Sequence, residues 1–198
     1  MSEGGRGARG EWLDPDAYRR DFRSRRQQLR HADCWTFQRR QDVEDSPGRA
    51  AVGRGDWEAA LALIEQQRPE VLRAVEEDRD RGRVLRCVRV VDSPITPHLR
   101  WQLRLLRMWA ECGLGSRVVE ASSLAGLEWH APLPDVVVLG DSVLYEVARG
   151  DGDALGAVRV TDPGVVRNWA EFLRQLHAVG EDVIPYVDRH VLPPPRVC

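Results

Sequence analysis

One continuous segment constrains the fold more than any other part of the chain: residues 83–112, RVLRCVRVVDSPITPHLRWQLRLLRMWAEC. Residues 83–91 are rich in β-branched side chains and predict a strand. Pro94 and Pro97 then interrupt the extended run, because neither can continue a hydrogen-bonded ladder. A helix is expected to follow at once, from Leu99 to about Cys112. A buried strand that leads directly into a helix predicts a fold that mixes both element types.

The predicted helix is apolar over most of its circumference. At about 100° per residue, its apolar side chains form two rows: Leu99, Leu103, Leu106 and Ala110, and beside them Trp101, Leu105, Met108 and Cys112. Only a narrow polar arc is left for solvent: Arg100, Arg104, Arg107 and Glu111. Such a helix must be covered on more than one side. We therefore expect it at the centre of the domain.

The other elements follow from apolar periodicity and from cap and turn residues. Helices are expected from Asp14 to about His31, from Asp56 to a break at Pro69, from Glu70 to about Asp80, and after Asp162. The acidic and basic run 76–83, EEDRDRGR, is interpreted as a solvated helix end. Further strands are expected at 34–39, 116–120, 135–139, 142–148 and 157–161, with a loop at 42–55 and a hairpin turn at 150–152. The predicted fold class is α+β (mixed α/β), a single sheet of about five to seven strands with helices packed on it.

Composition places the chain among folded, water-soluble proteins. It has 198 residues, 42% of them hydrophobic, with a net charge of −2, which is outside the range of disordered chains and sufficient for one core. We expect a disordered arm over residues 1–13, a single domain over 14–188 and a Pro-rich, extended C-terminal segment that starts near Pro185, with residues 189–198 as the tail outside the domain. No apolar run approaches the roughly 18 residues of a membrane helix, and the first residues lack the apolar core of a signal peptide. The expected location is the cytoplasm.

The absence of lysine excludes several chemistries. All 29 basic residues are arginine, so the chain lacks the lysine of a P-loop, of a Schiff base and of an HxK phosphodiesterase motif. The four cysteines contain no CxxC pair, and neither a metal site nor a cofactor is expected. Cys198 is either an accessible thiol open to modification or simply the last residue.

Charged side chains in and around the central segment are the candidate ligand-binding residues. Arg86 and Arg89 lie in an otherwise apolar strand and need partners, for which Asp92, Asp135 or Asp141 are available. Arg100 and Arg104 form either an anion clamp or an ordinary solvent strip, and His98 either an acid–base group or a helix-start packing residue. The candidates are Arg86, Arg89, His98, Arg100, Arg104 and Asp141. The sequence has no G-x-S-x-G, GxGxxG or HExxH motif, so we assign no catalytic residue.

A second group of arginines marks the first predicted helix. Arg19, Arg23, Arg26 and Arg30 follow one another at helical spacing. A stripe of this kind can lie along nucleic-acid phosphates, or it can be a solvated face beside acidic neighbours. These four are the nucleic-acid candidates.

The central segment also resembles a known family. Residues 86–103, RCVRVVDSPITPHLRWQL, are similar to the signature R-(V/R)-R-V-V-x-x-P-L-(S/T)-x-Y-(L/I)-R-(W/F)-E-L of an actinomycete family catalogued as domain of unknown function 6879. The family's other segments resemble residues 33–37, 134–141, 151–156 and 160–166, so the resemblance covers about residues 14–188. The family's Tyr and Glu appear here as His98 and Gln102, and its aromatic D-F-W segment as residues 135–138. The closing part also resembles a phospholipase-D-like half that lacks HxK.

Three functions remain open at this point. The resemblance implies a non-enzymatic accessory or regulatory protein that binds a partner protein, such as a helix-turn-helix regulator, or a small anionic ligand. Alternatively, the chain is an enzyme or scaffold of specialised-metabolite biosynthesis that holds an anionic substrate with arginines and His98. The third possibility is direct DNA binding through the N-terminal arginines.

Overall fold

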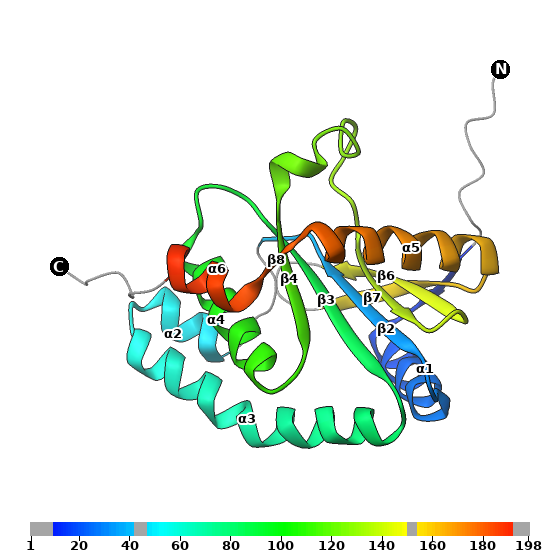
Figure 1. Ribbon diagram of the computed structural model, residues 1–198, viewed down its shortest axis with the longest axis horizontal. Helices are drawn as coiled ribbons and strands as arrows, with labels where there is room; N and C mark the ends of the chain where they lie inside the picture. The colour runs from blue at the N-terminus through cyan, green and yellow to red at the C-terminus, as the bar shows by residue number, and fades with distance from the viewer. Residues whose placement is uncertain (1–9, 42–46, 150–153, 192–198) are drawn as a thin grey trace.

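The computed structural model describes residues 10–41, 47–149 and 154–191 (Figure 1). Within this part, the strands are β1 (Glu11–Leu13), β2 (Asp33–Gln38), β3 (Val84–Val91), β4 (Gly115–Glu120), β5 (Asp135–Leu139), β6 (Val143–Arg149), β7 (Ala154–Val160) and β8 (Glu181–Asp182). The helices are α1 (Pro15–Gln28), α2 (Pro47–Gly53), α3 (Trp57–Asp80), α4 (Pro97–Glu111), α5 (Pro163–Val179) and α6 (Val183–His190), with a short 3-10 helix at Ala121–Leu124. The expected turn at 150–152, residues 1–9 of the arm, residues 192–198 of the tail and Cys198 lie outside the described residues.

All eight strands form one mixed sheet in the order β1-β7-β6-β5-β2-β3-β4-β8. The centre, β2-β3-β4, is parallel, and every other pair is antiparallel. The parallel pairs require crossovers, and α2 with α3 and then α4 provide them. The α+β prediction is confirmed, but the sheet has eight strands rather than five to seven. The strands that the pattern missed are β1 and β8 at the two edges, which are too short to show a period of two.

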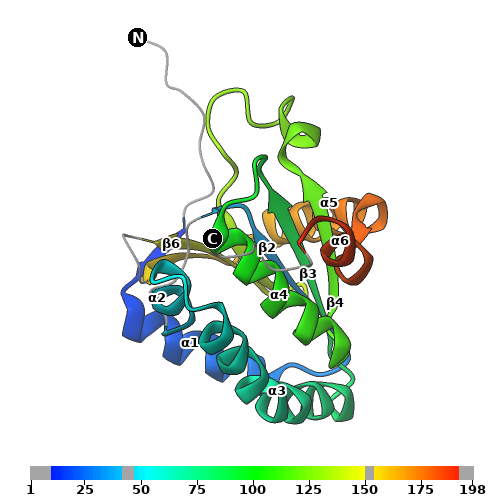
Figure 2. The same ribbon diagram turned by 90° about the vertical axis from the view of Figure 1, so that its left-hand side faces the viewer.

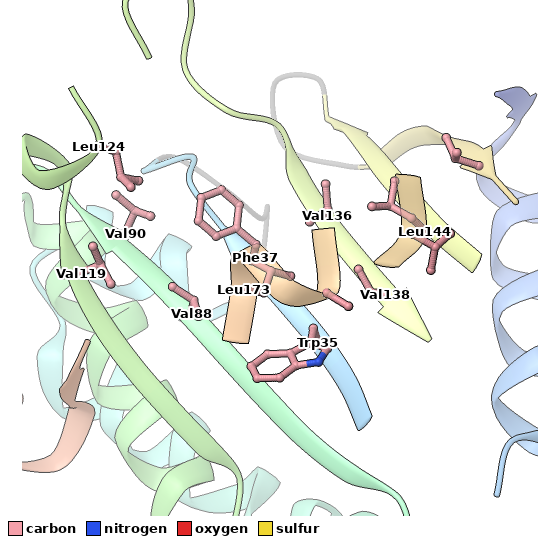
Figure 3. Packing of buried hydrophobic residues seen from close by; sticks show 13 residues of the cluster. Trp35, Phe37, Val88, Val90, Val119, Leu124, Val136, Val138, Leu144 and Leu173 are labelled. Atoms are coloured by element: carbon pink, nitrogen blue, oxygen red, sulfur yellow. The ribbon is translucent and has the colours of Figure 1, made fainter. Parts of the chain in front are cut away.

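Helices cover both faces of the sheet. Figure 2 shows α5 on one face and α1, α3 and α4 on the other. Under α5 lies a core drawn from β2, β3, β4, β5, β6 and β7, which Figure 3 shows from close by. On the opposite face, α4 and α6 share one cluster and α2, α3 and α4 share another. The central strands are therefore covered on both faces, and β5, although antiparallel to both of its neighbours, is covered as its apolar run predicted.

The central position predicted for the helix from Leu99 to about Cys112 is confirmed, and the observed helix is α4. Helix α4 begins after Thr96, whose Oγ1 accepts a hydrogen bond from the Leu99 backbone at 3.1 Å. Trp101 and Met108 are each 2% exposed, and Leu103 is fully buried. The polar arc is narrower than expected, because Arg104 is also buried.

Three segments differ from the prediction in the first half of the chain. Residues 11–13, expected in a disordered arm, pair with β7 as β1. The expected loop at 42–55 contains α2, because Ala51 and Val52 are buried against α3 and α4, and Gly48 packs directly on the Trp101 ring. Pro69 does not break α3. It lies on the exposed side, where water can satisfy the carbonyl that the missing N–H leaves unpaired.

The C-terminal segment also differs from the prediction. An extended chain was expected from Pro185, but α6 continues to His190. The Asp182 side chain caps this helix by accepting from the Ile184 backbone at 2.9 Å. Pro185 lies in the first turn, where a missing N–H costs nothing. Burial of Val183, Tyr186 and Val187 against α4 and β4 stabilises the helix.

Candidate functional site

The two strand arginines of β3, Arg86 and Arg89, lie on opposite faces of the sheet, because they are three positions apart and side chains alternate along a strand. Arg89 lies on the α4 face and is 2% exposed. Its Nη1 donates to the carbonyls of Gln38 at 3.2 Å and Arg40 at 2.6 Å, and its Nη2 donates to Gln102 Oε1 at 2.7 Å. Burial lowers the pKa of Arg89 to about 10. Arg89 thus ties the end of β2 to α4 from within the core.

Asp135 is one of the carboxylates expected to pair with the strand arginines. Its hydrogen bonds go mainly to the backbone that follows β2. Its Oδ1 accepts from the backbone of Arg39 at 2.7 Å and of Arg40 at 3.1 Å. Its charge also opposes the lowering of the Arg89 pKa. Asp135 therefore fixes the chain that leaves β2 and supports Arg89 electrostatically.

Arg86 lies on the α5 face. Its guanidinium carbon is 5.1 Å from the centre of the Trp35 ring, within the range of a cation–π contact. It forms an ion pair with Asp33 at the start of β2. Asp33 was not among the partners predicted for Arg86, and the parallel register that brings β2 beside β3 is what supplies it.

The arginines of α4 hold the end of α6. Arg100 Nη1 donates to the carbonyls of His190 at 3.3 Å and Val191 at 3.4 Å. Arg104 Nη2 donates to the Val191 carbonyl at 3.3 Å, and its guanidinium lies 5.8 Å from the Trp57 ring centre. Burial, followed by the charge of Arg100, lowers the pKa of Arg104. Cations at the C-terminus of a helix are a recurrent stabilising contact.

The structure does not bring His98, Arg86 and Arg100 together. His98 stacks on Trp101 at a centroid distance of 5.9 Å in the first turn of α4, beyond the carboxyl end of β3. Arg86 lies near the amino end of β3 and on the other face of the sheet. Asp141, the remaining candidate, lies exposed in the turn between β5 and β6. The candidate residues therefore do not converge on one site in the described part of the chain.

The N-terminal arginines instead contribute to a groove between α1 and the end of α3. The groove has a volume of about 510 Å³ and is lined by Tyr18, Arg19, Phe22, Arg23, Arg26, Gln27, Glu77, Arg81 and Arg83. We call it the α1–α3 groove. Five of the lining residues are arginines, and a single glutamate accompanies them. Two aromatic residues add an apolar wall, so the groove favours an anion that has some apolar surface.

A buried ion cluster fixes one side of this groove. Asp78 is 2% exposed and Arg83 is 4% exposed. Asp78 Oδ2 accepts from Arg26 Nη2 at 2.6 Å, and its Oδ1 accepts from Arg83 Nε at 2.7 Å. Arg83 Nη1 also donates to the Arg26 carbonyl at 2.6 Å. One carboxylate therefore joins α1, α3 and the start of β3.

The remaining arginines of the stripe have separate surroundings. Arg19 forms an exposed ion pair with Asp16 at 2.7 Å, and Arg30 Nη1 donates to the carbonyls of Gln27 and Leu29. Arg23 is exposed and lines the groove. Of the predicted stripe, Arg19, Arg23 and Arg26 line the groove and Arg30 does not. Sequence reasoning missed Arg81 and Arg83, since the run 76–83 was interpreted only as a solvated helix end.

Among the residues that the structure describes, no group of three or more His, Cys, Asp or Glu side chains is placed to hold a metal ion. Cys34, Cys87 and Cys112 are buried free thiols, and burial raises the pKa of Cys87 to about 12. No helix within the described ranges is long and apolar enough to cross a bilayer.

The fold and the groove define the class of the protein: an α+β protein built on one mixed eight-stranded sheet, with an arginine-lined groove beside the amino end of its parallel strands. The chain belongs to the family described as Domain of unknown function (DUF6879), whose model matches residues 16–188. No curated protein matches the chain.

Proposed function

We propose that this protein is a non-enzymatic accessory protein that binds a small anionic ligand in the α1–α3 groove. The observation that carries the proposal is the excess of arginine there, five against one glutamate, around an aromatic wall. Arginine presents planar pairs of N–H donors that match carboxylate and phosphate oxygens. Arg26 and Arg83 are already hydrogen-bonded to Asp78. Their guanidinium groups are therefore held in place along one side of the groove.

The exposed part of the site is its rim. Arg23 is exposed, and Arg19 has only an exposed partner, Asp16. An incoming anion exchanges that weak surface pair for a charge-assisted hydrogen bond inside the groove, at little cost. Arg23 is therefore the residue we expect to contribute most to binding.

Nucleic acid fits this surface less well than a small anion does. A phosphate backbone requires a row of available cations, and its affinity grows with the number of phosphates neutralised. Here the row is interrupted, since Arg26 is bound to buried Asp78 and Arg30 to backbone carbonyls. The groove is also short, with a volume close to that of small-molecule sites.

The biological setting of this proposal rests on the family resemblance. We propose that the protein is cytoplasmic and of actinomycete type, and that the ligand regulates its association with a partner such as a helix-turn-helix regulator. The sheet from β5 to β7 with α5 would then be a phospholipase-D-like half without its HxK pair. The missing lysine and the scattering of the candidate residues support a role without turnover.

The test is isothermal titration calorimetry of the full chain with inorganic pyrophosphate and, separately, with citrate at low ionic strength. We expect binding that R23E weakens by about tenfold or more, the loss expected for one charge-assisted hydrogen bond. The matched control is R167E, which makes the same charge change at an exposed position of α5. Binding that R23E and R167E weaken equally, or no binding of either anion, contradicts the proposal.

A further inference from the structure

A second hollow lies at the same end of the sheet but on its α5 face. It has a volume of about 460 Å³ and is lined by Leu29, His31, Ala32, Asp33, Trp35, Gly82, Gly140, Asp141, Ala170 and Arg174. We call it the Trp35 hollow. It shares no lining residue with the α1–α3 groove. The two can therefore be tested independently.

Trp35 contributes an unsatisfied donor. The residue is 2% exposed, and its indole Nε1 is buried without a hydrogen-bond partner among the described residues. Figure 3 shows this nitrogen on the side of the ring toward β5, whereas the six-membered ring extends toward β3. Gly140 and Asp141, which follow β5, also line the hollow. Folded proteins rarely leave a buried N–H unpaired, so a ligand acceptor at this position would satisfy it.

The charges around the hollow have both signs. Asp141 is exposed, and within the described part of the chain its carboxylate takes part in no hydrogen bond or ion pair. On the α5 side, Arg174 pairs, among the residues that the structure describes, only with exposed Glu171, which lies one turn away. Asp33 is already paired with Arg86. The hollow thus offers one carboxylate, from Asp141, and two N–H donors, from Trp35 and Arg174.

We propose that the Trp35 hollow binds a small zwitterion of the amino-acid type. The ligand carboxylate accepts hydrogen bonds from Trp35 Nε1 and Arg174, and the ligand ammonium group faces Asp141. The walls between these charges are formed by Leu29, Ala32 and Ala170, which leaves room for a short aliphatic side chain. This chemistry differs from that of the α1–α3 groove, where five of the nine lining residues are arginines.

The test follows the indole N–H signals of the ¹⁵N-labelled full chain by NMR. The chain has seven tryptophans, and W35F identifies the Trp35 signal; triple-resonance assignment replaces W35F should that variant fail to fold. The probes are glycine and L-alanine, with acetate and methylammonium as half-ligands. We expect both amino acids to shift the Trp35 signal downfield in a saturable manner, and the half-ligands to shift it at least tenfold more weakly.

Charge-neutral variants complete the test. D141N should weaken amino-acid binding by about tenfold, because it removes the partner of the ammonium group at an exposed position. D80N removes the same charge from the exposed end of α3 and should leave binding unchanged. A Trp35 signal that no amino acid moves, or one that acetate moves as strongly as glycine does, overturns the proposal, as does equal binding by D141N and the unaltered chain.

Discussion

Arg83 and Asp78 form a buried ion pair that joins the start of β3 to the last turn of α3. The same carboxylate binds Arg26 of α1 at 2.6 Å. One carboxylate therefore joins the α3–β3 connection to α1, which lies 52 residues away in sequence. Arg26 and Arg83 of this cluster also line the α1–α3 groove, so the stability of the fold and the shape of the groove depend on the same carboxylate.

We expect D78N to lower the free energy of unfolding by about 3–5 kcal/mol, because it leaves two arginines without their buried counter-charge. Equilibrium urea unfolding measures this change. D80N is the control, since Asp80 ends the same helix but is exposed. A D78N variant as stable as D80N would show that the cluster does not hold the three segments together.

Replacement of Gln102 by leucine should destabilise the protein by about 1–3 kcal/mol, because Arg89 Nη2 loses its acceptor inside the core. Leucine is close to glutamine in size, so the loss reports the hydrogen bond rather than a cavity. The shift in thermal unfolding midpoint provides the measurement. Q175L on α5 is a suitable comparison, since Gln175 bonds only to exposed Glu171. Equal shifts in the two variants would contradict the structural role of Arg89.

The stability of the protein should fall in acid partly through Glu128. Burial raises the pKa of Glu128, but hydrogen bonds from Arg39 and from the Leu133 backbone outweigh burial and leave that pKa below its ordinary value of 4.5. A carboxyl group with a lowered pKa in the folded state stabilises the fold above its unfolded pKa. This contribution is lost as the pH falls below about 4.5 and through the folded pKa.

E128Q tests this linkage. It should reduce stability at neutral pH by about 1–3 kcal/mol and make the loss between pH 5 and about pH 3 shallower than in the unaltered chain. Urea unfolding across this pH range gives both quantities. E58Q serves as the reference, because Glu58 is exposed in the first turn of α3. An acid dependence that E128Q leaves unaltered would remove Glu128 as a contributor.

Pro69 should lower the free energy of unfolding without changing the topology of the fold. Because α3 continues through Pro69, P69A restores a backbone donor to the helix and should raise the free energy of unfolding by about 1–3 kcal/mol. Chemical denaturation is again the measurement. Q66A, at an exposed site of the same helix, should change stability by only a few tenths of a kcal/mol. A P69A variant that is less stable than the unaltered chain would indicate that the proline stabilises a real break.

Local patterns were sufficient for the elements that have a strong period. Leu99, Trp101 and Leu103 are buried as the helical pattern predicted, and Asp14, Asp56 and Asp162 cap helices as expected. Sequence patterns failed to predict elements where tertiary burial stabilises a structure that the local residue preferences disfavour. Pro47 and Gly48 belong to α2 because that short helix packs on Trp101. The two contacting residues, Gly48 and Trp101, are more than fifty positions apart in the sequence.

The candidate site was less predictable than the fold. The sequence identified Arg86, Arg89, Arg100 and Arg104 as arginines that need explanation, and the structure explains each by a protein partner. It also identified the stripe on α1, but it could not show that the end of α3 lies opposite. That juxtaposition depends on Asp78, whose partners are 52 and 5 residues away.

The sequence by itself determined the class of fold, the central helix, the caps and the absence of lysine chemistry, because these depend on periodicity and residue type over a few turns. Only the tertiary structure decided which arginines are available to a ligand. The reason is physical: a guanidinium group binds whichever carbonyl or carboxylate the packing brings within about 3 Å. For Arg89 and Arg104 that partner comes from the chain itself, whereas Arg23 remains exposed on the groove.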